Sequence, residues 1–161
     1  MTVIRVDKDV DNLTLTLVAE FDAPIERVWQ LWADPRLLER WWGPPTYPAT
    51  VEVHELAPGG EVSYVLTGPD GEGNRGWWRI TAVDPPRSLA FVDGFADRDG
   101  TPRAGLPTTT IEVRLGEHEG GTRMEMRSTF ASVEHMEQVV DMGGVEGLQR
   151  AVGQVDALLA G

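Results

Sequence analysis

The chain has 161 residues, which suits one domain with a sizeable core, and its 26 acidic against 14 basic residues give a net charge of −12. This charge repels phosphate backbones and anionic lipids, so it argues against nucleic acid and a membrane surface as partners. The absence of cysteine excludes disulfides, thiolate nucleophiles and cysteine-ligated metals.

The first part of the chain predicts a strand followed by helix. Residues 10–20 alternate leucines with threonines, which is the period of a β-strand. A short helix should follow, with Asp22 or Ala23 as its cap and Pro24 in its first turn. The pair Asp34-Pro35 should end this helix and start another, because proline can begin a helix but not continue one.

Four tryptophans lie in or directly after these two helices, the second of which should cover residues 36–40. Large aromatic side chains bury the most surface per residue, so this concentration indicates a helical lid packed on a sheet. We expect structural roles for all four. Trp29 and Trp32 should form the core of the lid helix, and Trp41 and Trp42 should seat the lid on the sheet.

From residue 49 onward the pattern changes to alternation with a period of two. Turns rich in glycine and proline separate the runs, for example at 58–60, 68–71 and 119–121. Together with the first strand, they predict a curved antiparallel sheet of about six to seven strands. The predicted runs begin at 49, 62, 75, 89, 108 and 122.

The C-terminal segment predicts one long helix. Apolar residues recur at steps of three and four from Met136 to Leu159, and Ser132 is suited to cap the start. Each of several glycines inside this stretch is unfavourable in a helix by about 1 kcal/mol relative to alanine. They indicate a close backbone approach, a bend or simply a weak helix. The glycines concerned are Gly143, Gly144, Gly147 and Gly153.

Several motifs in the same order resemble a known superfamily. The segment 21–29 resembles the opening of the START-like (SRPBCC, Bet v 1-like) superfamily. Trp41-Trp42-Gly43-Pro44, together with segments 58–60, 84–89 and 142–147, resembles its Aha-type branch. That branch consists of homologues of the activator of the heat-shock-protein-90 ATPase, and the last segment resembles its bacterial members.

The resemblance implies an α+β helix-grip fold. In this fold a curved antiparallel sheet grips a long C-terminal helix, two short helices close one end, and a cavity lies between sheet and helix. The resemblance covers nearly the whole chain, so we expect a single domain over 1–161 with its core at 10–160.

Strand parity combined with this fold predicts which side chains face the cavity. The same residues would also suit an ordinary hydrophobic core, since lining and core look alike in a sequence. The candidate ligand-binding residues are Val53, Tyr64, Trp78, Phe91, Val113, Met126, Phe130, Met136, Val140, Gly144 and Leu148.

Two carboxylates are candidate catalytic groups. Asp93 shares strand parity with Phe91, so it should point into the apolar interior unless the strand bulges near Gly94. Glu55 also points inward by parity, although it lies at a strand end near solvent. A carboxylate in an apolar cavity has a raised pKa and can act as an acid or a base.

No metal or cofactor site is expected. His54, His118 and His135 have no metal-ligand spacing, and each is expected to be solvated. The glycine-containing stretch 93–106 is expected to form a flap near the cavity mouth, or else a variable surface loop.

We therefore expect a protein that binds a small hydrophobic or aromatic molecule in an internal cavity. Two alternatives remain within the superfamily: a polyketide cyclase, dehydratase or hydrolase type of enzyme, and a chaperone-interacting module. A monomer or homodimer is expected. The first residues show no apolar signal core and no segment suits membrane insertion, so we expect a cytoplasmic protein.

Overall fold

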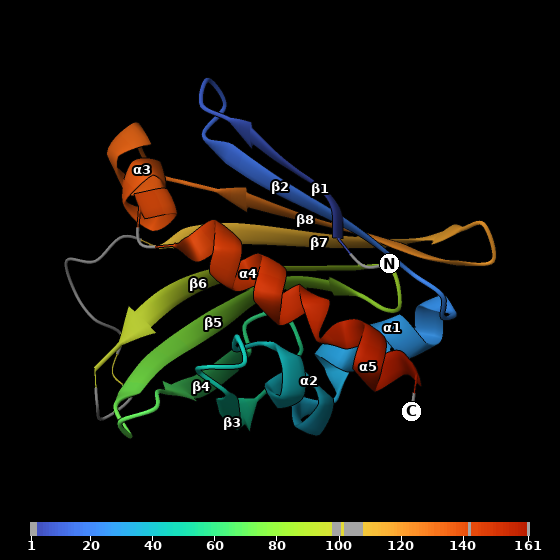
Figure 1. The fold of residues 1–161 in the computed structure, drawn as a ribbon, viewed down its shortest axis with the longest axis horizontal. Helices are drawn as coiled ribbons and strands as arrows, with labels where there is room; N and C mark the ends of the chain where they lie inside the picture. The colour runs from blue at the N-terminus through green and yellow to red at the C-terminus, as the bar shows by residue number, and fades with distance from the viewer. Residues whose placement is uncertain (1–2, 98–100, 102–107, 142, 161) are drawn as a thin grey trace.

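An eight-stranded antiparallel sheet runs through the molecule in the order β1-β2-β8-β7-β6-β5-β4-β3 (Figure 1). The computed structural model describes residues 3–97, 101, 108–141 and 143–160. The strands are β1 (Val3–Asp9), β2 (Thr14–Phe21), β3 (Ala49–His54), β4 (Glu61–Thr67), β5 (Gly73–Asp84), β6 (Ser88–Ala96), β7 (Thr109–His118) and β8 (Gly121–Thr129).

Five helices within the described residues accompany the sheet, and α4 crosses in front of it while α3 lies toward one end (Figure 1). No helix in the described part of the chain is long and apolar enough to span a membrane. The helices are α1 (Ile25–Ala33), α2 (Pro35–Trp41), α3 (Val133–Asp141), α4 (Gly144–Gly153) and α5 (Val155–Ala160).

The expected α+β class with one large antiparallel sheet is confirmed, with one strand more than predicted. The additional strand is β1, which pairs with β2 at the edge of the sheet. Its sequence mixes charged with apolar residues and so lacks a clear apolar face. Residues 10–13 form the turn between the two strands, so β2 begins at Thr14 instead of residue 10.

The two short helices form where the sequence predicts them. Pro24 is the N-cap of α1, one or two residues later than expected. The break at Asp34-Pro35 is confirmed, and the Asp34 side chain accepts a 2.9 Å hydrogen bond from the Arg36 backbone N–H. This satisfies one of the N–H groups that a helix start leaves without a partner.

The single long C-terminal helix was a wrong prediction, because the segment forms three helices. Gly143 has a φ of +80°, a left-handed conformation that favours glycine, and it separates α3 from α4. A second break falls at Gln154, whose side-chain amide donates to the Gly43 carbonyl at 2.7 Å. The helix glycines therefore mark a bend, one of the expected alternatives. The expected Ser132 cap is present, with the His135 N–H donating to Ser132 Oγ at 3.1 Å.

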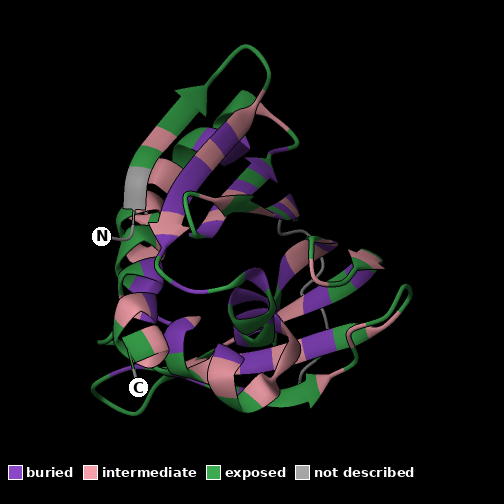
Figure 2. Ribbon diagram, turned by 90° about the vertical axis from the view of Figure 1, so that its right-hand side faces the viewer, coloured by how far each residue is buried: buried purple, intermediate pink, exposed green. Residues whose placement is uncertain are grey.

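Buried residues alternate with exposed ones along the strands, so one face of the sheet carries most of the core (Figure 2). Trp32 of α1 packs against Trp41 with 4.8 Å between ring centroids and against Trp78 of β5 with 5.9 Å. Trp78 stacks on Phe91 of β6 at 4.0 Å. These contacts join the helical lid to the centre of the sheet.

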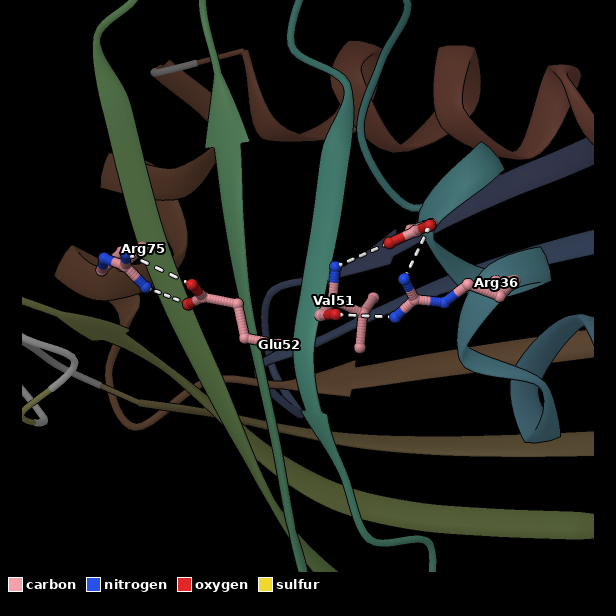
Figure 3. A network of polar contacts seen from close by, with 5 residues as sticks. Arg36, Val51, Glu52 and Arg75 are labelled. Carbon is pink, nitrogen blue, oxygen red and sulfur yellow. Dashed lines mark hydrogen bonds and ion pairs between the residues drawn. The ribbon is translucent and has the colours of Figure 1, made fainter.

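The edge strand β3 is tied to α2 by side chains. Glu39 accepts a 3.0 Å hydrogen bond from the Val51 backbone N–H, and Arg36 donates a 2.9 Å bond to the Val51 carbonyl (Figure 3). On β3, Glu52 forms an ion pair with Arg75 of β5, which lies two strands away. The two bonds from α2 satisfy the backbone N–H and carbonyl of Val51 on the outer edge of the sheet, where unpaired backbone groups would otherwise be available to another chain.

Candidate functional site

A pocket of about 240 Å³ opens between the sheet and the C-terminal helices. Its walls come from β2, β4, β6, β7 and β8 on one side, and from α3, α4 and the segment after α2 on the other. Most of the lining is apolar. The lining residues are Leu15, Trp42, Pro44, Tyr64, Leu66, Asp93, Thr109, Ile111, Met126, Ser128, Phe130, Val139, Gly144, Gly147 and Leu148.

A second pocket of about 170 Å³ adjoins the first, because Tyr64 and Asp93 line both. This pocket is more polar, and it adds a guanidinium and an imidazole to the surroundings of Asp93. The residues that line this pocket and not the first are Asn74, Arg75, Gly76, Gly94, Phe95 and His135.

Two of the residues that line both pockets form a hydrogen-bonded pair. The Tyr64 hydroxyl donates to Asp93 Oδ1 at 3.0 Å. Tyr64 lies on β4 and Asp93 on β6, so the bond reaches across β5. Gly76 of β5 lies opposite Tyr64, and a Cβ at Gly76 would be 2.3 Å from the Tyr64 hydroxyl oxygen. Glycine at this position therefore leaves the room that the bond needs.

Loss of hydration raises the pKa of Asp93 from 3.8 to about 7, while the hydrogen bond from Tyr64 acts in the opposite direction. Burial, and next the nearby charge of Asp93, raise the pKa of Tyr64 well above its ordinary value. Near neutral pH the tyrosine is thus a hydrogen-bond donor, and the carboxyl group can both take up and release a proton. Asp93 lines both pockets, so its side chain has the direction given by strand parity, and the pairing of β6 with β7 has no shift before it.

His135 departs from its expected solvation. Its exposed fraction is 5%, its ring packs edge-on against Phe130 at 5.3 Å, and its Nδ1 has no hydrogen-bond partner. Burial lowers its pKa, which favours the neutral imidazole. The first turn of α3 places it on the more polar pocket.

The other two histidines serve structural contacts. His54 Nε2 lies 3.0 Å from the Trp32 carbonyl, which joins β3 to α1 and leaves the ring half-buried instead of solvated. His118 Nε2 lies 2.9 Å from Glu20 Oε2. Within the described ranges, no three acidic or histidine side chains gather in a way that would hold a metal ion.

Ten of the eleven predicted ligand-binding residues fall into three groups. Five of them line the apolar pocket: Tyr64, Met126, Phe130, Gly144 and Leu148. Four are fully buried in the core behind it and line neither pocket: Trp78, Phe91, Val113 and Met136. Val140 is half-buried on α3 and also lines neither pocket.

Val53 was wrongly expected to face inward. The pairing of β3 with β4 shifts between Val51 and Val53, and such a bulge reverses the alternation that follows it. Val53 therefore pairs with Ser63 on the outer face and is 40% exposed. Glu55 is exposed beyond the end of β3 and lines neither pocket, so it takes the solvent-exposed position expected of a strand end and not the inward direction that parity gives.

Of the four lid tryptophans, Trp29, Trp32 and Trp41 are buried. Trp42 is half-buried and lines the apolar pocket, where a purely structural position was expected. Strand parity does not identify such a residue, because it belongs to a loop that the structure folds over the sheet. The expected flap lies largely outside the described residues, which here include only 93–97 and 101.

Comparisons with known proteins agree with this architecture. Residues 22–160 match the family described as activator of Hsp90 ATPase homolog 1-like protein, so the chain belongs to that family. This confirms the Aha-type resemblance drawn from the tryptophan, proline and glycine motifs. Among curated proteins, no match was found.

Solved bacterial structures share the whole fold. A protein from Mycobacterium smegmatis is 55% identical, with 98% of this chain and 96% of that chain covered and a TM-score of 0.91. A protein from Arthrobacter aurescens is 52% identical, with 99% and 92% covered and a TM-score of 0.94. A protein from Rhodobacter sphaeroides is 26% identical, with 97% of each chain covered and a TM-score of 0.84.

Proposed function

We propose that this protein binds a small hydrophobic or aromatic molecule in the pocket between its sheet and its C-terminal helices. The observation that carries the proposal is the lining of the 240 Å³ pocket, which is largely apolar around one hydrogen-bonded pair, Tyr64 and Asp93. Binding sites for small molecules commonly combine apolar walls with a few polar groups that fix orientation.

The pocket can be filled without disturbing its other walls. Gly147 lines it, and a Cβ built there has no atom within 4 Å. A Gly147→Leu substitution should therefore occupy open space at the pocket wall. Gly153 of the same helix also has open space around its Cβ, but it lines neither pocket, so Gly153→Leu is a matched control.

The test has two parts. Native mass spectrometry of freshly purified protein should detect a retained small molecule, and titration with the apolar fluorophore phenylnaphthylamine should give saturable binding. Gly147→Leu should weaken that binding at least about tenfold, whereas Gly153→Leu should leave it near the wild-type value. Equal binding by the two variants would contradict the proposed location, and the absence of binding by wild type would contradict the proposal.

An enzyme that uses Asp93 as an acid or base is a second candidate. The observation that favours it is a carboxyl group with a pKa of about 7 in a pocket, where proton transfer at neutral pH is efficient. Cyclisation, dehydration and hydrolysis all need such a group. Asp93→Asn should abolish turnover of a substrate while the substrate still binds, and unchanged turnover would eliminate this assignment.

A chaperone-interacting role, which the family description suggests, has less support. Such a role needs a contiguous exposed apolar face. The large exposed apolar residues in the described part of the chain belong to four separate segments: Val10 to the turn after β1, Val53 to β3, Phe95 to β6 and Val133 to α3. We therefore base the proposal on the pocket.

A further inference from the structure

The two pockets contain one acidic group. Among the described residues that line them, Asp93 is the only carboxylate, and it lines both pockets. Its Oδ1 accepts the hydrogen bond from Tyr64. A ligand in either pocket therefore lies close to an acceptor that carries a negative charge whenever it is deprotonated.

The basic groups nearby do not offset this charge. Arg75 lines the more polar pocket, but its guanidinium makes two contacts with the carboxylate of Glu52 on β3 (Figure 3). His135 is buried, and burial favours its neutral form. Its ring lines the same pocket, and its buried Nδ1 has no hydrogen-bond partner. The pocket environment is therefore suited to a donor with positive charge.

Aromatic rings line both pockets that Asp93 shares. Trp42, Tyr64 and Phe130 line the apolar pocket, and Phe95 lines the more polar one. The face of an aromatic ring attracts cations, most strongly where water is excluded. A carboxylate combined with several aromatic rings is an arrangement that recognises an ammonium group attached to an apolar body.

We infer that the ligand is a small amphipathic amine, whose protonated nitrogen binds at Asp93 and whose aromatic or aliphatic body fills the apolar pocket. This inference rests on the proposed binding function and specifies its ligand class. An ammonium group forms an ion pair with Asp93, while an alcohol of the same shape gains a hydrogen bond without the attraction between opposite charges. A carboxylate ligand places like charges together and is disfavoured.

Proton exchange should accompany binding. Near neutral pH, Tyr64 of β4 stays protonated, His135 of α3 stays neutral, and Arg75 of β5 stays paired with Glu52. Asp93 of β6 is the pocket group that changes its protonation in this range. Because the cation favours the carboxylate, amine affinity should decrease as the pH falls below about 7.

A matched ligand series tests this inference by calorimetry. Phenylethylamine, phenylethanol and phenylpropionate share an apolar body and differ in the charge of the polar end. At about pH 8 the amine should bind about tenfold more tightly than the alcohol, and the carboxylate should bind most weakly. The preference for the amine should decrease severalfold at about pH 6.

Two variants test whether Asp93 causes the preference for the amine over the alcohol. Asp93→Asn should bind the amine no better than the alcohol, whereas Glu55→Gln, which removes an exposed carboxylate outside both pockets, should keep the wild-type preference. If Asp93→Asn is poorly folded, the decrease in the amine preference of wild type at low pH tests the role of Asp93 instead.

Three results would overturn the amine inference: equal affinity for amine and alcohol, tightest binding of the carboxylate, and an amine preference that persists in Asp93→Asn. If none of the three ligands bound while phenylnaphthylamine still bound, the amine inference would fail and the proposed function would stand. If phenylnaphthylamine did not bind either, both would fail.

Discussion

Tyr64 on β4 and Asp93 on β6 form a 3.0 Å hydrogen bond across the intervening strand β5. Side chains on neighbouring strands meet readily. Contact across an intervening strand needs a long side chain and a residue with little or no side chain on the strand between. Tyr64 is the long side chain, and Gly76 of β5 leaves the space over which it extends. The polar centre of the pocket therefore depends on a residue with no side chain.

Gly76→Ala should displace the Tyr64 hydroxyl. A Cβ at 2.3 Å from that oxygen forces the ring to move, and overpacking of this kind costs about 1–3 kcal/mol. Urea denaturation should detect the loss. Gly116→Ala on β7 is the matched control, because a Cβ there has no atom within 4 Å. Equal stability of the two variants would show that Gly76 is not required for the position of Tyr64.

Asp93 should make stability depend on pH. Its pKa is about 7 in the folded protein against 3.8 ordinarily, so between these pH values the folded protein holds a proton that the unfolded chain has lost. The resulting stabilisation is fully present below pH 3.8 and is lost as the pH rises through about 7. Asp93→Asn should remove this dependence and gain stability relative to wild type from about pH 4 to about pH 8.

The size of that gain is limited by solvent. The full pKa difference corresponds to about 4 kcal/mol at about 1.36 kcal/mol per pKa unit. Because Asp93 is half-buried beside an open pocket, we expect about 2 kcal/mol. Urea midpoints of wild type and variant at both ends of the pH range measure it, with the exposed Asp84→Asn as a control. A constant difference between wild type and Asp93→Asn would contradict the raised pKa.

Two directions for Asp93 were possible from the sequence, inward by parity or turned by a bulge near Gly94, and the sequence did not identify the hydrogen-bond partner. Alternation along β6 placed Asp93 with Phe91, and no bulge altered that parity. Alternation failed on β3, where one shift in pairing turned Val53 outward. Bulges depend on how two strands pair, which is information about distant residues. The burial of His135 depends in the same way on Phe130 and the pocket wall, and no local pattern marks it.

Glu39→Ala should weaken the edge of the sheet. The Val51 N–H would lose its side-chain acceptor, and an unpaired, partly buried N–H costs about 1–2 kcal/mol. An uncovered edge also promotes association between chains, so light scattering on heating should increase. Arg40→Ala, which changes an exposed residue of the same helix, is the control. Similar scattering by both variants would argue against an edge-covering role for Glu39.

Two glycines of α4 should respond to alanine in opposite ways. Gly147 has open space around its Cβ position, so Gly147→Ala should stabilise the protein by up to about 1 kcal/mol through helix propensity. A Cβ at Gly144 would lie 2.7 Å from Val139 Cγ1 and 2.9 Å from the Val139 carbonyl oxygen, so Gly144→Ala should destabilise it. Thermal unfolding distinguishes the two, and a shift of the same sign in both would contradict the described bend between α3 and α4.

The sequence pattern revealed the helical content of this tail but not its division. Apolar spacing of three and four residues continues through Gly143, since a bend between two helices need not interrupt which face is apolar. Only the backbone conformation at Gly143 shows the break. Side-chain periodicity therefore predicts which surface is covered more reliably than it predicts where a helix ends.

The tryptophan cluster also has an optical consequence. Trp32 with Trp41, and Trp42 with Trp78, are held 4.8 Å apart at interplanar angles of 82° and 84°. Indoles fixed this closely in an asymmetric arrangement produce strong near-ultraviolet circular dichroism, which disappears when tertiary packing loosens even if secondary structure persists. The molecule thus contains its own spectroscopic reporter of lid docking. Because Trp42 belongs to both the cluster and the pocket wall, an occupant of the pocket should alter the same signal.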